Sequence, residues 1–268
     1  MTHAPALPLQ QSPGFGAALG LLGRRVARYD LPGAAPVQII RRFGLRFAPR
    51  GPVWATPDPA ALRALRIHVI NSDRDQPDVM RMAGYRQIMT SAYVAELDLT
   101  GSHDDRLNNA HGKWRNIWRR GRRGPFRIKR EPFAPDLHHW LLQADLDQQR
   151  SKGYRALPQN VLHAFATLYP QDAILFTARI KRDPIAAMLL LCHAPVVTYH
   201  IGWTNADGRK LGAHHALLIQ AADHFAAQGF TRLDLGNVDT ENAAGLARFK
   251  IGSGADIRAL GGTWLRMP

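Results

Sequence analysis

The 268-residue sequence is poor in cysteine, in lysine and in long apolar runs. Its single cysteine, Cys192, excludes a disulfide framework and a cysteine zinc cluster, so a reducing compartment is expected. No apolar stretch approaches the roughly 20 residues that a membrane-spanning helix requires. No secretory signal is evident, because Arg24 and Arg25 follow the short apolar stretch at 17–23 instead of preceding it. The sequence therefore predicts a cytoplasmic protein.

Positive charge is what the sequence has in excess. The formal net charge is +14 at pH 7, and only six of the 35 basic residues are lysines. Such a charge favours a polyanionic partner, for example tRNA, an acidic carrier protein, a nucleotide-linked substrate or an anionic membrane face. The arginine- and alanine-rich composition of a GC-rich genome would produce the same excess, so the charge alone does not decide between partners.

Residues 231–254 carry the strongest candidate for a chemical site. Polar and apolar residues alternate over 231–235, which predicts a strand that ends at Gly236 with Asp234 facing away from its apolar neighbours. A polar loop follows, and residues 243–250 predict a short helix or turn that brings Lys250 beside the end of the strand. A second interpretation is also open, in which Asp234 only pairs with an arginine and Lys250 is only solvated.

This stretch resembles the late signature of the FemABX family of peptidyl and aminoacyl transferases, within the wider acetyltransferase-like (GNAT) superfamily. That signature is a strand ending in Asp-hydrophobic-Gly, a polar loop, and Gly-Leu-x-x-Phe-Lys. Here it consists of Asp234-Leu235-Gly236 and of Gly245-Leu246 followed by Phe249-Lys250. Other family landmarks occur in the expected order, including the Pro-Arg-Gly-Pro-Val turn at 49–53, and the resemblance covers nearly the whole chain after Pro13.

The resemblance implies an α+β fold with two tandem GNAT-like domains, each a mixed β-sheet flanked by helices, and a cleft between them. Residues 1–13 are expected to form a flexible tail, residues 14–125 the first domain, and residues 126–268 the second domain, which carries both motifs. The helical hairpin that some family members insert to engage tRNA has no counterpart in this sequence.

The family also implies a chemistry: an amine attacks an activated carbonyl, either an ester of tRNA or a thioester, without a covalent enzyme intermediate. Lys250 is the candidate for stabilising the oxyanion. Asp234 and His200 are the candidates for orienting the amine or accepting its proton. We expect no bound cofactor and no metal, since the adjacent His214 and His215 have no cysteine or carboxylate at ligand spacing.

Four residues are predicted to bind the acceptor: Arg50, Arg155, Phe249 and Asn237. In the family an arginine in the loop around Arg155 helps to hold a phosphate-bearing acceptor; a solvated loop is the alternative. Arg50 either lines the acceptor cleft or is exposed on a rigid turn. Members that lengthen cell-wall peptides carry a lysine in the first helix, and the matching stretch here, residues 15–20, has none. A standard muropeptide acceptor is therefore doubtful.

Four further residues are predicted to bind the donor: Arg209, Gly212, Arg115 and Arg119. The turn at 209–214 is glycine-containing, basic and placed before a helix, which is typical of an anion site, although helix capping accounts for the same residues. It resembles the pyrophosphate loop of acyl-CoA enzymes except that His214 replaces the last small residue. Arg115 and Arg119 flank the apolar stripe of a basic helix predicted over 104–120 and capped by Ser102.

The sequence therefore predicts an N-acyltransferase that uses aminoacyl-tRNA as co-substrate and an amine-bearing acceptor, with peripheral contact to the inner membrane face as a further possibility. One alternative is an acyltransferase that uses acyl-CoA or an acyl carrier protein. A second is a non-catalytic, basic RNA-binding module.

Overall fold

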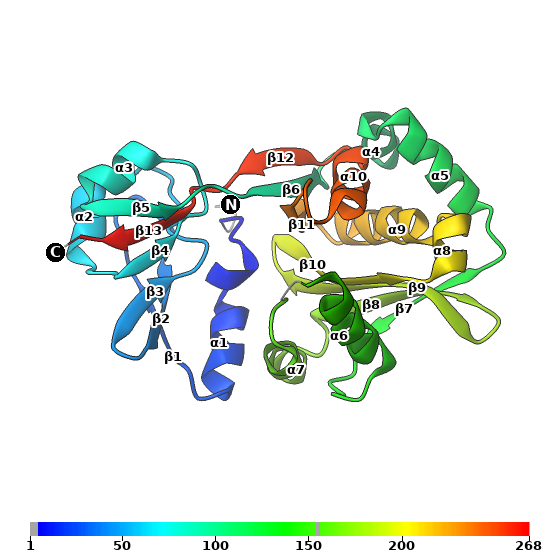
Figure 1. Ribbon diagram of the computed structural model, residues 1–268, viewed down its shortest axis with the longest axis horizontal. Helices are drawn as coiled ribbons and strands as arrows, with labels where there is room; N and C mark the ends of the chain where they lie inside the picture. The colour runs from blue at the N-terminus through cyan, green and yellow to red at the C-terminus, as the bar shows by residue number, and fades with distance from the viewer. Residues whose placement is uncertain (1–4, 154–155, 268) are drawn as a thin grey trace. The chain divides into compact units, whose positions relative to one another are not determined.

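The computed structural model describes residues 5–153 and 156–267 (Figure 1). The chain divides into two compact units: residues up to Val94 together with those from Arg258 onward, and residues from Ala95 to Ile257. The chain passes between the two units within strand β6 (Tyr93–Asp98) and within strand β12 (Asp256–Ala259). In the described part of the chain, no helix combines the length and the hydropathy needed to cross a bilayer.

The first unit is built on a six-stranded mixed sheet with the order β1-β2-β3-β4-β13-β5. The neighbours pair antiparallel except for β3 and β4, which are parallel. The C-terminal strand β13 lies between β4 and β5, so the end of the chain completes the unit that its beginning forms. The elements are η1 (Leu9–Gln11), α1 (Pro13–Leu21), β1 (Arg25–Tyr29), β2 (Val37–Arg42), β3 (Leu45–Ala48), α2 (Pro59–Ala64), β4 (Val69–Asn71), α3 (Pro77–Met82), β5 (Tyr85–Met89) and β13 (Thr263–Arg266).

The core of the first unit lies between its sheet and the helices α2 and α3. Leu62 of α2 and Met80 of α3 are buried together with Ile39, Ile70 and Trp264 of the sheet. The carboxylate of Asp58 caps α2 by accepting the N–H of Ala61 at 3.0 Å, and Pro59 occupies the first helical position, where its missing N–H costs nothing.

The second unit is built on a seven-stranded sheet with the order β12-β6-β11-β10-β9-β8-β7. Strands β7 to β10 form an antiparallel meander, and β11 is parallel to β10. Strand β9 is a nearly continuous apolar run because it is buried on both faces. The remaining elements are α4 (His103–Asn109), α5 (Gly112–Arg122), β7 (Arg127–Pro132), α6 (Trp140–Lys152), α7 (Gln159–Leu168), β8 (Ala173–Ile180), β9 (Asp183–His193), β10 (Val196–Thr204), α8 (Ala206–Leu211), α9 (Ala213–Ala227), β11 (Arg232–Val238) and α10 (Ala244–Gly252).

Helices α5 and α9 pack closely in the second unit, and two glycines permit the contact. A Cβ on Gly121 of α5 would lie 2.4 Å from the backbone oxygen of Gly212, and a Cβ on Gly212 would lie 2.5 Å from the backbone oxygen of Ile117. The core beneath them joins side chains of α5, α9 and the sheet, including Trp118, Leu217 and Phe225. The start of α9 is therefore fixed against the backbone of α5.

The predicted pair of mixed sheets flanked by helices is present. The division of the chain differs from the predicted one, because the predicted boundary between residues 125 and 126 lies inside the second unit. The physical reason is that α5 packs on α9 and α10 and that Arg106 of α4 pairs with Asp223 of α9, so the basic helix belongs to the second unit.

The basic helix itself is divided. Ser102 caps α4 through a capping box with Asp105, as predicted, but the helix ends at Asn109 and a second helix, α5, begins at Gly112. At the break the N–H of His111 donates to the backbone oxygen of Gly252 at 2.9 Å. A single predicted helix over 104–120 is therefore wrong, because the backbone between α4 and α5 pairs with the end of α10 instead of continuing its own ladder.

Candidate active site

Strand β11 carries the predicted catalytic aspartate. Leu233 and Leu235 are buried in the core, whereas Asp234 points to the opposite face of the strand and is also buried. The backbone N–H of Gly236 donates to Oδ1 of Asp234 at 2.7 Å. Gly236 has a φ of +76°, a left-handed conformation that glycine adopts at little cost, so the chain turns directly after the carboxylate.

The parallel strands β10 and β11 pair over only a short distance. Their register joins Val196–Thr198 to Arg232–Asp234, and the last pair is Thr198 with Asp234. Both strands continue in fully described parts of the chain, β10 to Thr204 and β11 to Val238. The two strands therefore part after the pair of Thr198 with Asp234.

A β-bulge in β10 lies at the same level. The pairing of β10 with β9 shifts between Tyr199 and Ile201, so His200 is the inserted residue. Tyr199 and Ile201 consequently face opposite sides of the sheet, although a regular strand would place them on one side. Burial lowers the pKa of His200 to about 4, which leaves its imidazole neutral at pH 7 and makes it a weaker base than an exposed histidine.

Lys250 of α10 is a buried cation beside the end of β11. Only 5% of its surface is exposed, and its Nζ donates to the backbone oxygen of Asn237 at 2.7 Å. Burial lowers the pKa of Lys250 to about 8, and the negative charge of Asp234 partly opposes this shift. The structure thus brings together three of the predicted site residues, Asp234, Asn237 and Lys250.

Phe249 is adjacent to Lys250 in sequence but contacts the core. Its ring centroid lies 5.0 Å from that of His214, 5.1 Å from His215 and 6.1 Å from Trp114. Its backbone oxygen accepts the indole N–H of Trp114 at 2.9 Å. These contacts hold α10 against α5 and α9. Packing therefore explains why the motif has a phenylalanine at this position, and no contact with a ligand is needed.

The other predicted acceptor residues lie in different surroundings. Arg50 belongs to the first unit, where it is buried and its Nε donates to Oδ1 of Asp73 at 2.9 Å. Arg258 lies 3.4 Å from the same carboxylate, so Asp73 joins two arginines. Arg155 lies outside the described residues. Acceptor binding by these residues stays a prediction.

Two of the predicted donor residues have structural contacts. Arg115 donates from Nη1 to the backbone oxygens of Leu107 at 3.3 Å and Asn108 at 3.2 Å, so it satisfies carbonyl groups at the end of α4. Gly212 joins α8 to α9 with a φ of +71° and packs on α5 as described above. Arg209 is exposed and donates to the backbone oxygen of Thr204 at 2.8 Å.

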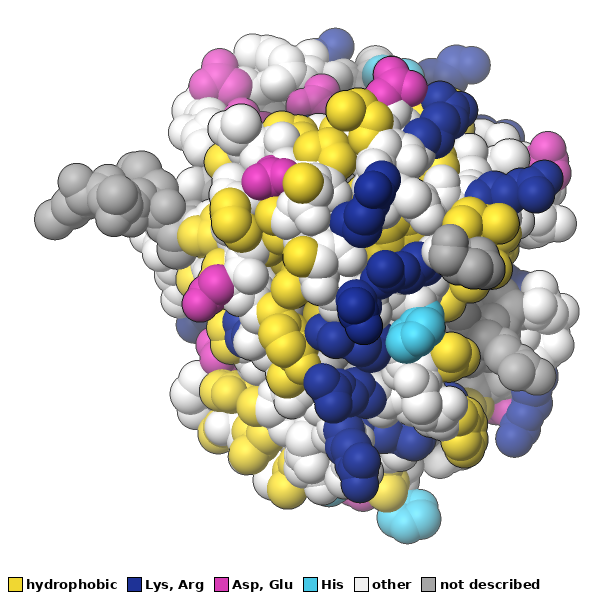
Figure 2. All heavy atoms as spheres, turned by 90° about the vertical axis from the view of Figure 1, so that its left-hand side faces the viewer, with side chains coloured by type: hydrophobic (Ala, Val, Ile, Leu, Met, Phe, Trp, Pro, Cys, Tyr) yellow, Lys and Arg dark blue, Asp and Glu magenta, His cyan; other side chains and the backbone are white. Residues whose placement is uncertain are grey.

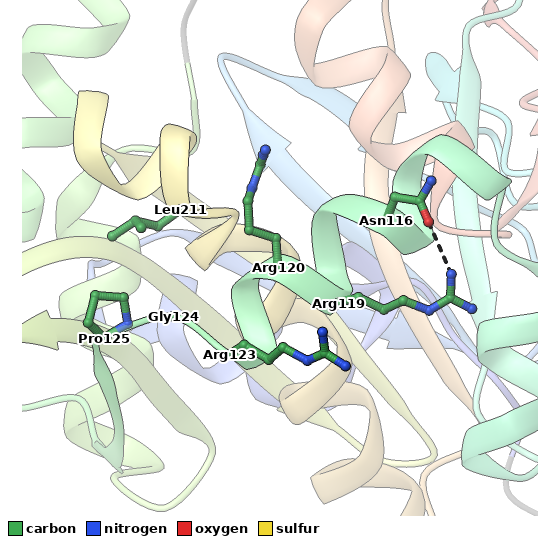
Figure 3. A pocket seen from close by; sticks show the side chains of 7 residues that line it. All are labelled: Asn116, Arg119, Arg120, Arg123, Gly124, Pro125 and Leu211. Atoms are coloured by element: carbon green, nitrogen blue, oxygen red, sulfur yellow. Dashed lines mark hydrogen bonds between the residues drawn. The ribbon is translucent and has the colours of Figure 1, made fainter.

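Arg119 lines an arginine-rich hollow of about 480 Å³ on the surface of the second unit (Figure 3). Arg119 donates to the side-chain oxygen of Asn116 at 3.0 Å, and Arg120 and Arg123 also line the hollow. Leu211, at the end of α8, lies on its other side. All three arginines are exposed, and guanidinium groups are suited to hydrogen bonds with phosphate oxygens. The turn at 209–212 and the arginines of α5 are therefore neighbours.

Three features of this region were absent from the sequence prediction: the parting of β10 from β11, the bulge at His200, and a partly buried pair formed by Tyr199 and His214. The hydroxyl of Tyr199 lies 3.0 Å from Nε2 of His214. A Cβ on Gly202 would overlap that hydroxyl, so glycine at 202 is required by the pair. Among the described residues, no group of three or more His, Cys, Asp or Glu could hold a metal ion.

Comparison with known proteins identifies the fold. Residues 115–250, just over half of the chain, match the model of the acetyltransferase (GNAT) domain family. This match runs from α5 to α10 and ends at Lys250. No curated protein sequence matches the chain.

Solved structures share the fold at low sequence identity. The crystal structure of FemX superposes with a TM-score of 0.74 at 12% identity, over 96% of this chain and 93% of that chain. The C-terminal domain of a protein from Agrobacterium fabrum described as a lysylphosphatidylglycerol synthetase gives 0.59 at 15% identity, over 97% and 89%. L-PGS from Bacillus licheniformis gives 0.56 at 16% identity, over 96% and 89%. The predicted FemABX-like GNAT fold is confirmed.

The lowered pKa of Lys250 makes a prediction about stability. Between the folded pKa of about 8 and the unfolded value of 10.5, the unfolded chain binds more protons, so stability should rise with pH in this window. We expect wild type to gain about 2–3 kcal/mol relative to Lys250→Met between pH 7 and pH 10. Urea unfolding of both proteins at the two pH values measures the difference. If the difference in the free energy of unfolding between wild type and Lys250→Met were the same at pH 7 and pH 10, Lys250 would have an ordinary pKa.

Proposed function

The chain belongs to the family of acetyltransferase (GNAT) domains, and we propose that it forms an amide bond by transferring an aminoacyl group from aminoacyl-tRNA to an amine acceptor. The observation that carries this proposal is the buried ammonium group of Lys250, held by the backbone oxygen of Asn237 at the level where β10 and β11 part. A desolvated cation at the end of paired strands is suited to an oxyanion, because the low local polarity strengthens the attraction.

The proposed reaction follows from these groups. The amine nitrogen of the acceptor attacks the ester carbonyl carbon, and negative charge develops on the carbonyl oxygen. Lys250 donates to that oxygen, and the neutral imidazole of His200 or the carboxylate of Asp234 takes the proton that the amine loses. The carbon–oxygen bond of the ester then breaks, and the leaving ribose oxygen takes up a proton and becomes a hydroxyl group. No bound cofactor is required.

Two observations support tRNA as the donor. FemX and a protein described as a lysylphosphatidylglycerol synthetase share the fold, and the second name denotes synthesis of a lipid that carries a lysyl group. The arginine hollow formed by Arg119, Arg120 and Arg123 offers several exposed cations to a phosphate backbone. An acyl-CoA donor is the second candidate. Leu211 of the short helix α8 lines the same hollow, and the exposed Arg209, which the sequence predicts to bind the donor, belongs to the same helix.

The role of Lys250 predicts a loss of catalysis without a loss of binding. Lys250→Ala should lower kcat for amide formation about 10²- to 10³-fold, since one oxyanion donor contributes about 3–4 kcal/mol. Lys129→Ala, which removes an exposed lysine on β7, is the matched control and should leave kcat unchanged. Single-turnover assays with aminoacyl-tRNA and a panel of amines measure both. Full activity of Lys250→Ala would exclude Lys250 as the group that stabilises the oxyanion. Absence of any transfer by wild type would favour the RNA-binding alternative.

The hollow predicts how binding of the donor depends on salt. Arg119→Gln with Arg123→Gln should reduce the slope of log K against log salt by about 1.4–1.8 if each arginine contacts one phosphate. Lys181→Gln with Arg182→Gln removes the same charge from the exposed β8–β9 turn and should leave the slope unchanged. Titrations with charged tRNA, uncharged tRNA and acyl-CoA at several salt concentrations measure it. Saturable acyl-CoA binding without preference for charged tRNA would favour the second candidate.

A further inference from the structure

One end of the sheet in the first unit collects the ends of all six strands. Strand β1 begins here, because its first residue, Arg25, pairs with Arg41 near the end of β2. The hairpin turn at Phe43–Gly44 joins β2 to β3 at this end. Strand β4 is parallel to β3 and therefore begins here, β13 is antiparallel to β4 and ends here, and β5 begins here. The helices α2 and α3 also end nearby, because Nε of Arg63 donates to the backbone oxygen of Ala83 at 3.4 Å. The topology thus builds one surface from segments far apart in sequence.

This end of the sheet, which we call the arginine edge, is strongly cationic. The first unit contains 14 arginines and five aspartates, without lysine or glutamate. Asp30, Asp73 and Asp75 follow the opposite ends of β1 and β4, and the other two aspartates lie at the starts of α2 and α3. The arginine edge consists of Arg25, Arg41, Arg42, Arg46, Arg63, Arg66 and Arg266.

The contacts of these arginines are not with carboxylates. In the described residues Arg41 donates to the hydroxyl of Tyr29 at 2.8 Å, and Arg266 donates to the backbone oxygen of Arg63 at 3.4 Å. Arg46 lies over the ring of Tyr29, 4.9 Å from its centroid. The positive charge of the edge is therefore not neutralised within the described part of the unit.

Exposed apolar side chains accompany the charge. Phe43 at the hairpin turn is 88% exposed, Met82 is 65% exposed, and Leu45 and Met267 are 51% and 43% exposed. Figure 2 shows a band of Lys and Arg side chains beside hydrophobic ones on the face at the end of β13. This combination of cations and unburied apolar groups is typical of an interaction surface.

Phe43 is held in a costly conformation. Its φ of 49° is left-handed, where a bulky residue is strained and where two-residue hairpins favour Asn or Gly. The only ring contact described for it is with Arg42, whose guanidinium carbon lies 4.9 Å from the ring centroid. Packing therefore does not explain an aromatic residue at this position.

We propose that the arginine edge docks on an anionic lipid bilayer. The guanidinium groups would bind lipid phosphates, and Phe43 with Leu45, Met82 and Met267 would enter the boundary between headgroups and acyl chains. RNA would use the arginines and one stacked ring, but it offers no apolar phase to the leucine and the two methionines. The mixture of aliphatic and cationic groups therefore favours a membrane over a nucleic acid.

Co-sedimentation of the full chain with vesicles tests the proposal. We expect binding to phosphatidylcholine vesicles containing 30% phosphatidylglycerol, on the order of the anionic content of natural membranes, and much weaker binding to pure phosphatidylcholine. Arg41→Gln with Arg42→Gln should weaken binding about 30-fold, about fivefold per charge. Phe43→Asn should weaken it about tenfold and leave thermal stability unchanged or higher, because Asn suits the turn. Phe43→Trp, which keeps an aromatic side chain at this position, should bind vesicles as wild type does.

Matched variants in the second unit serve as controls. Lys181→Gln with Arg182→Gln removes two charges from another hairpin turn, and Leu168→Asn removes another exposed apolar side chain. Both should bind vesicles as wild type does. Equal effects of control and edge variants, or no binding to anionic vesicles, would overturn the proposal. The proposal would also be overturned if the double variant Arg41→Gln with Arg42→Gln bound tRNA less tightly but bound vesicles as wild type does. The assay uses no acyl donor, so its outcome is independent of the proposed function.

Discussion

The second unit has to hold one buried ammonium group in place. Lys250 loses most of its hydration, and the backbone oxygen of Asn237 and the charge of Asp234 compensate only in part, so its pKa falls to about 8. Such a group persists only where the surrounding structure holds it in place. Here the neighbouring Phe249 is held by Trp114, His214 and His215, and the turn after Lys250 receives the N–H of His111.

These contacts explain why the basic helix is interrupted. A continuous helix over 104–120 would direct the N–H of His111 into its own ladder, whereas the break frees it for the end of α10. The same break leaves carbonyl groups at the end of α4, which Arg115 satisfies. Part of the cationic character of this helix therefore supports the fold, whereas Arg119, Arg120 and Arg123 line the surface hollow.

The sequence predicts what depends on local pattern. Alternation located Asp234 on the face opposite Leu233 and Leu235, the capping box located Ser102, and the family motif located Lys250. It could not predict the bulge at His200 or the parting of β10 from β11, because both depend on the register between strands, which the pattern within one strand does not determine. The place of β13 in the first sheet and the exposure of Phe43 likewise depend on tertiary structure, which a single sequence does not reveal.

The most direct test of the account compares wild type with Lys250→Arg in the rate of aminoacyl transfer from pH 6 to pH 10. Arginine stays protonated throughout, and deprotonation of the acceptor amine cancels in the ratio of the two rates. If protonated Lys250 stabilises the oxyanion, the ratio of wild-type to variant rate should fall with an apparent pKa of about 8. A ratio that is constant, or that rises with pH, would contradict the account.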